Sequence, residues 1–156
     1  MNCYTHNFED VLIQRAFADI EQGFYVNVGA FLPVADSNTY GLYTSNWTGI
    51  AIEPNVSEEL LKMWCETCSG DVLLEKAVSN ESGDLEFHVF NAGQISTGSK
   101  ASVAYWKENG HEPTHVKTVA QVTLNTIIEA QPDMTDWHLL YIDVEGMEYD
   151  VLQGLN

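Results

Sequence analysis

The chain has 156 residues, and its 6 lysines and arginines against 23 aspartates and glutamates give a formal net charge of −17. This balance argues against nucleic acid and against an anionic membrane surface as partners, because both need clustered basic side chains. No run approaches the roughly 20 apolar residues of a membrane span, and the N-terminus lacks the basic and apolar segments of a signal peptide. We therefore expect one domain, residues 1–156, in the cytoplasm.

The first third of the chain predicts two strands, each preceded by a helix. Apolar residues recur at helical spacing over residues 7–20, and Asn7 is the expected cap of that lead-in helix. Phe24–Val28 is a near-continuous apolar run, which is typical of a central parallel strand. A short helix from position 36 or 37 to about 45 separates it from a second strand over residues 49–53.

The middle of the chain predicts a third strand and a small antiparallel insert. Residues 72–78 form an apolar run that we interpret as the third strand. Alternating apolar and polar residues then predict strands at about 84–90 and 115–122, within an insert spanning about 84–122. Thr123 is the expected cap of the helix that follows.

Residues 138–153 predict a fourth main strand and a final helix. The apolar run Leu139–Val144 ends in acidic residues, and Gly154 ends the helix. Strands that alternate with helices indicate an α/β fold with a mostly parallel, Rossmann-like sheet and helices on both faces. Such sheets usually continue for about one to three more strands, so the chain looks C-terminally truncated. The alternative is that a partner, such as a second copy of the chain in a homo-oligomer, covers the exposed sheet edge.

Two motifs lie where the first two strands end, which is where ligands bind in open α/β sheets. Gly29 lets the backbone turn closely past a ligand. The dinucleotide pattern of spaced glycines is absent, because residues 31–34 are Phe, Leu, Pro and Val, so a cofactor without phosphates fits better. Glu53 ends the second strand, where a carboxylate can accept both hydroxyls of a ribose.

A third motif follows the fourth strand. Asp143 and Glu145 are two residues apart, so on an extended strand both side chains point to the same side. They are expected at the carboxyl edge of the sheet, over the cofactor crevice.

Together these motifs resemble the FkbM-type methyltransferases, which use S-adenosylmethionine. The matching segments are Gly23–Ala30 with Asp36–Thr39, then Gly49–Asn55, and finally Ile142–Gly146 with Glu148 behind it. Any one motif is weak, whereas the ordered set spans nearly the whole chain. The resemblance implies a class I methyltransferase sheet in a single domain whose cofactor half is residues 24–79.

Carried over residue by residue, the resemblance implies a site for S-adenosylmethionine. Gly29 and Ala30 would pass the methionine part of the cofactor, and Glu53 would hold the ribose hydroxyls. Asp143 would lie near the sulfonium and the acceptor. The other cofactor-binding positions are Asn27 in the first strand, Asp36, Ser37 and Asn38 in the binding loop, Pro54 and Asn55 after Glu53, and Ala77 and Val78 beside the adenine.

Asn27 departs from the family pattern, which usually has an acid at this place. An amide removes one negative charge from the pocket of a cationic cofactor. The carboxylates of Glu53, Asp143 and Glu145 keep the predicted site acidic.

These roles predict an enzyme that transfers a methyl group from S-adenosylmethionine to a hydroxyl of a small molecule or sugar. Asp143 or Glu145 is the expected catalytic base, or both bind a divalent cation that acidifies the hydroxyl. Two alternatives stay open. Asn27 and the early end of the chain favour a non-catalytic cofactor-binding remnant or interaction module, and Glu53 also suits the ribose of a nicotinamide-dependent oxidoreductase.

Overall fold

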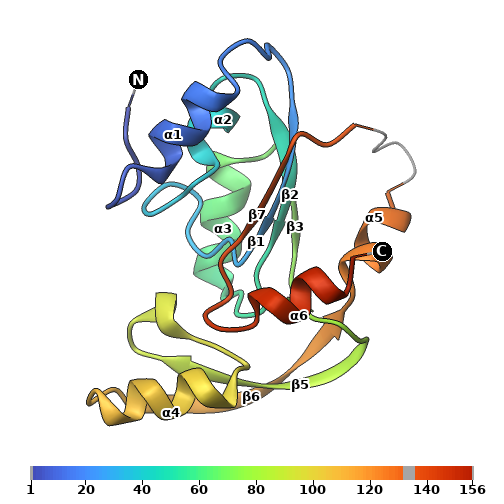
Figure 1. The fold of residues 1–156 in the computed structure, drawn as a ribbon. Coiled ribbons are helices and arrows are strands. Elements are labelled where there is room, and N and C mark those ends of the chain that lie inside the picture. The colour runs from blue at the N-terminus through green and yellow to red at the C-terminus, as the bar shows by residue number, and fades with distance from the viewer. Residues whose placement is uncertain (1, 132–135, 156) are drawn as a thin grey trace. The chain divides into compact units, whose positions relative to one another are not determined.

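The computed structural model describes residues 2–131 and 136–155, which fall into two compact units (Figure 1). The first unit holds residues 2–74 and 136–141, and the second holds residues 75–131 and 142–155. No helix among these described residues is long and apolar enough to span a membrane.

The first unit is built on a four-stranded sheet. Its strands are β1 (Phe24–Val28), β2 (Thr48–Ile52), β3 (Val72–Leu74) and β7 (Leu139–Ile142), in the order β3-β2-β1-β7. β1 and β2 are parallel, with Phe24 opposite Thr48 and Val28 opposite Ile52, and β3 lies parallel to β2. Parallel strands end at the same edge, so the residues that follow β1 and β2 meet there. The predicted α/β fold with a mostly parallel, Rossmann-like sheet is confirmed.

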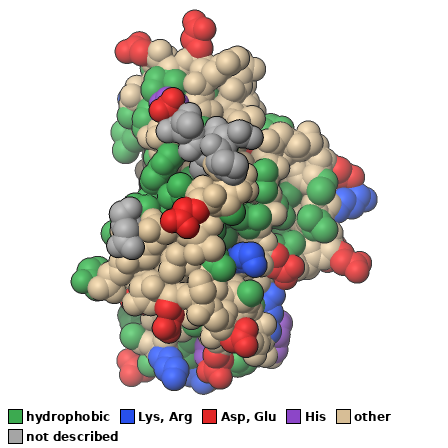
Figure 2. Space-filling view, turned by 90° about the vertical axis from the view of Figure 1, so that its right-hand side faces the viewer, with side chains coloured by type: hydrophobic (Ala, Val, Ile, Leu, Met, Phe, Trp, Pro, Cys, Tyr) green, Lys and Arg blue, Asp and Glu red, His purple; other side chains and the backbone are tan. Residues whose placement is uncertain are grey.

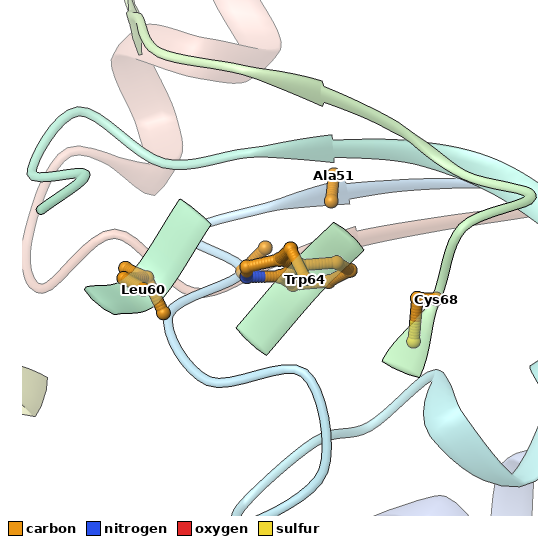
Figure 3. Packing of buried hydrophobic residues seen from close by; sticks show 5 residues of the cluster. Ala51, Leu60, Trp64 and Cys68 are labelled. Carbon is orange, nitrogen blue, oxygen red and sulfur yellow. The ribbon is translucent and has the colours of Figure 1, made fainter. Parts of the chain in front are cut away.

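Three helices lie on one side of this sheet (Figure 1): α1 (Glu9–Ala16), α2 (Tyr40–Tyr43) and α3 (Glu58–Thr67). Ser57 begins α3, because its side chain accepts a hydrogen bond of 3.1 Å from the backbone N–H of Leu60. Trp64 of α3 lies against Ala51 of β2 in a buried apolar cluster (Figure 3).

Both helices predicted before and after β1 are shorter than expected. α1 begins after Phe8, which occupies the N-cap position with a left-handed φ of 66°. The expected cap at Asn7 therefore lies one residue before the observed one. α2 begins only at Tyr40, because Asp36 has a φ of 56° and Ser37 accepts a hydrogen bond from the Tyr40 N–H. A left-handed residue cannot lie inside a right-handed helix, so the segment before Tyr40 is a loop.

A buried polar cluster lies where β3 begins. The Asp71 carboxylate accepts hydrogen bonds from the Gly49 N–H, at 2.8 Å, and from the Tyr25 hydroxyl. Burial raises the pKa of Asp71 to about 6, although both hydrogen bonds act to lower it. Burial also raises the pKa of the Cys68 thiol to about 12, with a further contribution from the Asp71 charge.

The described residues of the second unit form a three-stranded sheet and three α-helices. The strands are β4 (Ala77–Val78), β5 (Gly83–Phe90) and β6 (Pro113–Val122), in the order β4-β6-β5. The helices are α4 (Lys100–Glu108), α5 (Leu124–Glu129) and α6 (Glu148–Gln153), with a 3₁₀ turn, η1, at Gly93–Ile95. β5 and β6 are antiparallel, as the alternating sequence predicted. Thr123 caps α5 by accepting a hydrogen bond from the Thr126 N–H, as predicted.

The predicted third strand, residues 72–78, is wrong as a single strand. β3 ends at Leu74 in the four-stranded sheet, whereas β4 pairs with β6 in the other sheet. The polar pair Glu75 and Lys76 interrupts the apolar run, and the Glu75 carboxylate lies 3.9 Å from the ammonium of Lys117 on β6.

Acidic side chains are scattered over the face shown in Figure 2 rather than gathered in one patch, as the net charge of −17 leads one to expect.

Candidate cofactor and catalytic site

The loop after β1 turns sharply at Gly29, which has a φ of 85°. The backbone N–H groups of Gly29 and Ala30 both donate to the carbonyl oxygen of Ile52, at 2.9 and 3.0 Å. A side chain at position 29 would strain this left-handed turn, so the glycine is required by the backbone itself. The loop is thereby held against the end of β2, as the predicted site needs.

Glu53 follows β2 directly, and only 7% of its surface is exposed. Its carboxylate accepts a hydrogen bond from the Phe31 N–H, at 3.1 Å, and another from the Asn55 N–H, at 2.8 Å. Pro54 lies in a bend between Glu53 and Asn55. The carboxylate therefore connects the loop after β1 to the turn after β2, a structural role that the sequence did not indicate.

Phe31 and Trp64 extend this connection to α3. The indole N–H of Trp64 donates to the carbonyl oxygen of Phe31 at 3.0 Å. Phe31 has a left-handed φ of 41°, which turns its N–H toward Glu53 and its carbonyl toward Trp64. Sequence reasoning missed both residues, because an apolar loop residue and a helix tryptophan carry no local signal of such a role.

Two buried amide oxygens beside this loop have no hydrogen-bond partner among the described residues. Asn27 is 3% exposed, and its Nδ2 donates to the Thr39 hydroxyl at 3.2 Å while its Oδ1 is unpaired. Asn38 next to Thr39 also has a buried, unpaired Oδ1. An unpaired buried acceptor costs about 1–3 kcal/mol, so a ligand that donates to these oxygens would recover that free energy.

Two other predicted positions in the loop have contacts within the protein. The Ser37 hydroxyl is buried and accepts from the Tyr40 N–H at 3.1 Å. Asp36 contacts the ring of His6, and its backbone N–H donates to the carbonyl oxygen of Tyr4. Both residues shape the loop, and their contacts with a cofactor stay predictions.

Asp143 and Glu145 belong to the second unit. β7 ends at Ile142, two residues earlier than predicted, and Glu145 has a left-handed φ of 54°. The alternation of an extended strand therefore does not orient these two side chains, and that argument was wrong. The carbonyl of Glu145 accepts a hydrogen bond of 2.8 Å from the buried Thr97 hydroxyl, which fixes the turn.

The pKa values of Glu145 and Glu148 in this turn are shifted in opposite directions. Burial raises the pKa of Glu145, and the negative charges of Asp143 and Glu148 raise it further. Burial acts in the same direction on Glu148, but backbone N–H donors, including Gly146 and Val144 at 3.1 Å, outweigh it and lower its pKa. Glu148 is thus held as a carboxylate that organises the turn, and Asp143 lies close enough to Glu145 to interact with it.

The structure groups the predicted site residues into two sets. Asn27, Asn38 and Glu53 lie around the loop after β1 in the first unit, and Asp143 and Glu145 lie in one turn of the second unit. Ala77 and Val78 are buried in β4, and Ala77 packs in a cluster with Phe87 and Val119, so their place beside an adenine stays a prediction. Among the described residues no group of three or more His, Cys, Asp or Glu side chains is placed to hold a metal ion.

Comparison with protein families identifies a Methyltransferase FkbM domain over residues 27–156. The chain belongs to the FkbM methyltransferase family. The match runs from β1 to the end of the chain and contains every cofactor and catalytic position predicted from the sequence. It confirms the resemblance and supports methyl transfer as the activity. Comparisons with curated proteins and with solved structures gave no match.

Proposed function

We propose that this FkbM-family chain is an S-adenosylmethionine-dependent methyltransferase that methylates a hydroxyl of a small molecule or sugar. The observation that carries the proposal is the loop after β1. There the Gly29 turn, the anchored Glu53 carboxylate and the unpaired oxygens of Asn27 and Asn38 share one edge of a parallel sheet. Open α/β sheets bind their ligands at this edge.

The donors of the cofactor match the acceptors of this loop. The amino group and the ribose hydroxyls of S-adenosylmethionine all donate hydrogen bonds. Asn27 Oδ1 and Asn38 Oδ1 would accept from the amino group, and Glu53 would accept from the ribose, because a carboxylate offers about four acceptor positions. Asn27 therefore keeps an acceptor where the family has an acid, but without the charge.

When bound, the cofactor supplies a methyl group on a positively charged sulfur. The protein must hold the acceptor oxygen in line with that methyl group and remove the hydroxyl proton. A carboxylate of this chain would take up the proton that the acceptor hydroxyl loses on methylation, and the electron pair of the broken methyl–sulfur bond would remain with the cofactor. The raised pKa of Glu145 suits it to accept that proton, and the lowered pKa of Glu148 suits it to remain ionised and hold the turn.

Asp143 is the second candidate for the base, and it is the more exposed of the two. Coordination of a divalent cation by Asp143 and Glu145 is the other route to an acidified hydroxyl. Turnover of Glu145→Gln and Asp143→Asn, each with and without Mg²⁺ and a chelator, separates these routes. A base at Glu145 predicts that only Glu145→Gln loses at least about 100-fold in kcat, with no effect of the chelator.

Calorimetry with S-adenosylhomocysteine and with NAD⁺ tests the cofactor. We expect S-adenosylhomocysteine to bind and NAD⁺ not to bind, because the loop lacks a phosphate cradle. Glu53→Gln should weaken binding by about 10- to 100-fold, since hydrogen bonds to a charged group contribute about 1.5–3 kcal/mol. Glu66→Gln on the exposed side of α3 removes the same charge as a control and should leave the affinity unchanged.

No binding of S-adenosylhomocysteine at millimolar concentration would overturn the proposed function. Binding without methyl transfer to any tested hydroxyl acceptor would favour the non-catalytic cofactor-binding module, which Asn27 motivates. Tighter binding of NAD⁺ than of S-adenosylhomocysteine would favour the oxidoreductase.

A further inference from the structure

A second candidate site lies entirely within the second unit. It is a pocket of about 400 Å³, lined by the loop between β4 and β5, by one residue each of β5 and β6, by the start of α4, and by the segment that leads into and begins α6. Gly146 and Met147 in its lining follow Glu145 directly in the chain. The pocket therefore adjoins the turn that holds the proposed base.

The pocket contains a buried polar group that the protein leaves unpaired. Gln121 of β6 is 8% exposed and lines the pocket, and its buried Oε1 has no hydrogen-bond partner in the part of the chain that the structure describes. Opposite Gln121 on β5 lies Gly83, which has no side chain to cover or satisfy it. Farther along the same face of the sheet, Leu85 and Val119 pair across the strands and are apolar. A buried glutamine at the end of an apolar face is costly unless a ligand supplies a donor.

The charges around the pocket favour a ligand with a positive charge. Glu81 and Asp150 contribute two carboxylates to its lining, against one ammonium from Lys100. The whole chain carries a net charge of −17, which raises the local concentration of cations.

An anion is the competing ligand, because the pocket includes the start of α4. Ser99 caps that helix, and its hydroxyl accepts from the Ser102 N–H at 3.3 Å. A helix N-terminus favours anions, but the unpaired atom of Gln121 is an acceptor, and the ionised oxygens of an anion have no proton to donate to it. Hydroxyl and ammonium donors satisfy both the amide oxygen and the two carboxylates.

We propose that this pocket is the acceptor subsite of the enzyme and that it selects a hydroxylated amine of the amino-sugar class. The inference rests on the proposed function for the transfer step, whereas binding of the amine does not require the cofactor. Gln121 accepts from a hydroxyl of the ligand, and Asp150 and Glu81 face its ammonium. The position of Gly146 and Met147 brings the ligand toward the turn of Asp143 and Glu145.

Binding of glucosamine, glucose and glucuronate to the whole chain tests the inference. The three probes share a hydroxylated ring and differ in charge, and at about pH 6.5 an amine with a pKa near 8 is protonated. Amide shifts of ¹⁵N-labelled protein report binding at Gly98 and Gly146, which both line the pocket. We expect shifts with glucosamine. Glucose should bind with an affinity at least about fivefold lower, as measured by titrating the same shifts, and glucuronate should cause no shifts.

Two variants locate the ligand. Gln121→Leu should abolish the shifts. Asp150→Asn, on α6, should weaken glucosamine binding and leave glucose unaffected. Glu108→Gln at the C-terminal end of α4 removes the same charge outside the pocket and should change neither. If Gln121→Leu does not fold, Asp150→Asn against Glu108→Gln decides alone.

The remaining outcomes each refute one part of the proposal. Equal affinity for glucose and glucosamine refutes the amine, and tighter binding of glucuronate shows an anion site. Absence of shifts at Gly98 and Gly146 with all three probes refutes the pocket as a sugar subsite. If S-adenosylhomocysteine binds the same preparation but glucosamine does not, the acceptor assignment fails and the methyltransferase stands. If only glucosamine binds, the proposed function fails instead.

Discussion

The buried carboxyl of Asp71 predicts a pH dependence of stability that one substitution isolates. Burial raises its pKa from an ordinary 3.8 to about 6. The folded protein therefore binds this proton more tightly than the unfolded chain does. The contribution to stability is fully present below about pH 4 and is lost as the pH rises through about 6. A shift of about two pKa units corresponds to about 3 kcal/mol in the free energy of unfolding.

Urea unfolding of the wild type and Asp71→Asn as a function of pH measures this effect. Asparagine does not titrate, so the difference between the two free energies of unfolding removes the other carboxylates from the comparison. We expect the free energy of unfolding of the wild type, relative to that of Asp71→Asn, to fall by about 2 kcal/mol between about pH 4.5 and 7.5. Asp71→Asn also loses one of the two acceptor oxygens that bind Gly49 and Tyr25, which offsets the curve without changing its slope. A difference that is flat, or that rises with pH, would refute the reasoning.

Three further substitutions test the local structure. Ser57→Ala removes the cap of α3 and should cost about 1 kcal/mol in urea unfolding, whereas Ser82→Ala, at an exposed serine outside any cap, serves as the control. Gly146→Ala should cost about 2 kcal/mol, because the residue has a φ of 99° and its new Cβ would lie 2.2 Å from the Ser102 hydroxyl; no loss of stability would show that the turn relaxes. Gly49→Ala should prevent folding, or lower the thermal midpoint by more than about 10 °C, because the Cβ would lie 2.2 Å from the Tyr25 ring and 2.4 Å from its carbonyl oxygen.

The parts of the fold that the sequence predicted well depend on local patterns. The apolar run of β1 and the alternation of β5 with β6 each determine burial over several residues, and all three strands formed as expected. The split between β3 and β4 was not predictable in this way, because pairing partners, rather than the run of apolar residues, decide where a strand ends. The left-handed conformations at Asp36 and Glu145 were missed for a similar reason, since neither is a glycine and long-range hydrogen bonds hold each in place.

The same contrast between local patterns and long-range contacts applies to the candidate site. Position along the chain identified Gly29 and Glu53, because a turn and a carboxylate at strand ends have a recognisable spacing. Gln121 had no such signal, because a glutamine in an alternating strand looks like any solvent-facing residue. Only its burial opposite Gly83 shows that it is an unpaired acceptor.

The hydrogen bond from the Trp64 indole to the Phe31 carbonyl makes this tryptophan an intrinsic spectroscopic reporter. Phe31 also donates to Glu53, so we expect a ligand that moves this carboxylate to change the environment of the buried Trp64 indole. The difference between emission of the wild type and of Trp64→Phe isolates this signal from the other three tryptophans. Occupancy of the loop after β1 can therefore be followed in real time, without a label and before any acceptor is known.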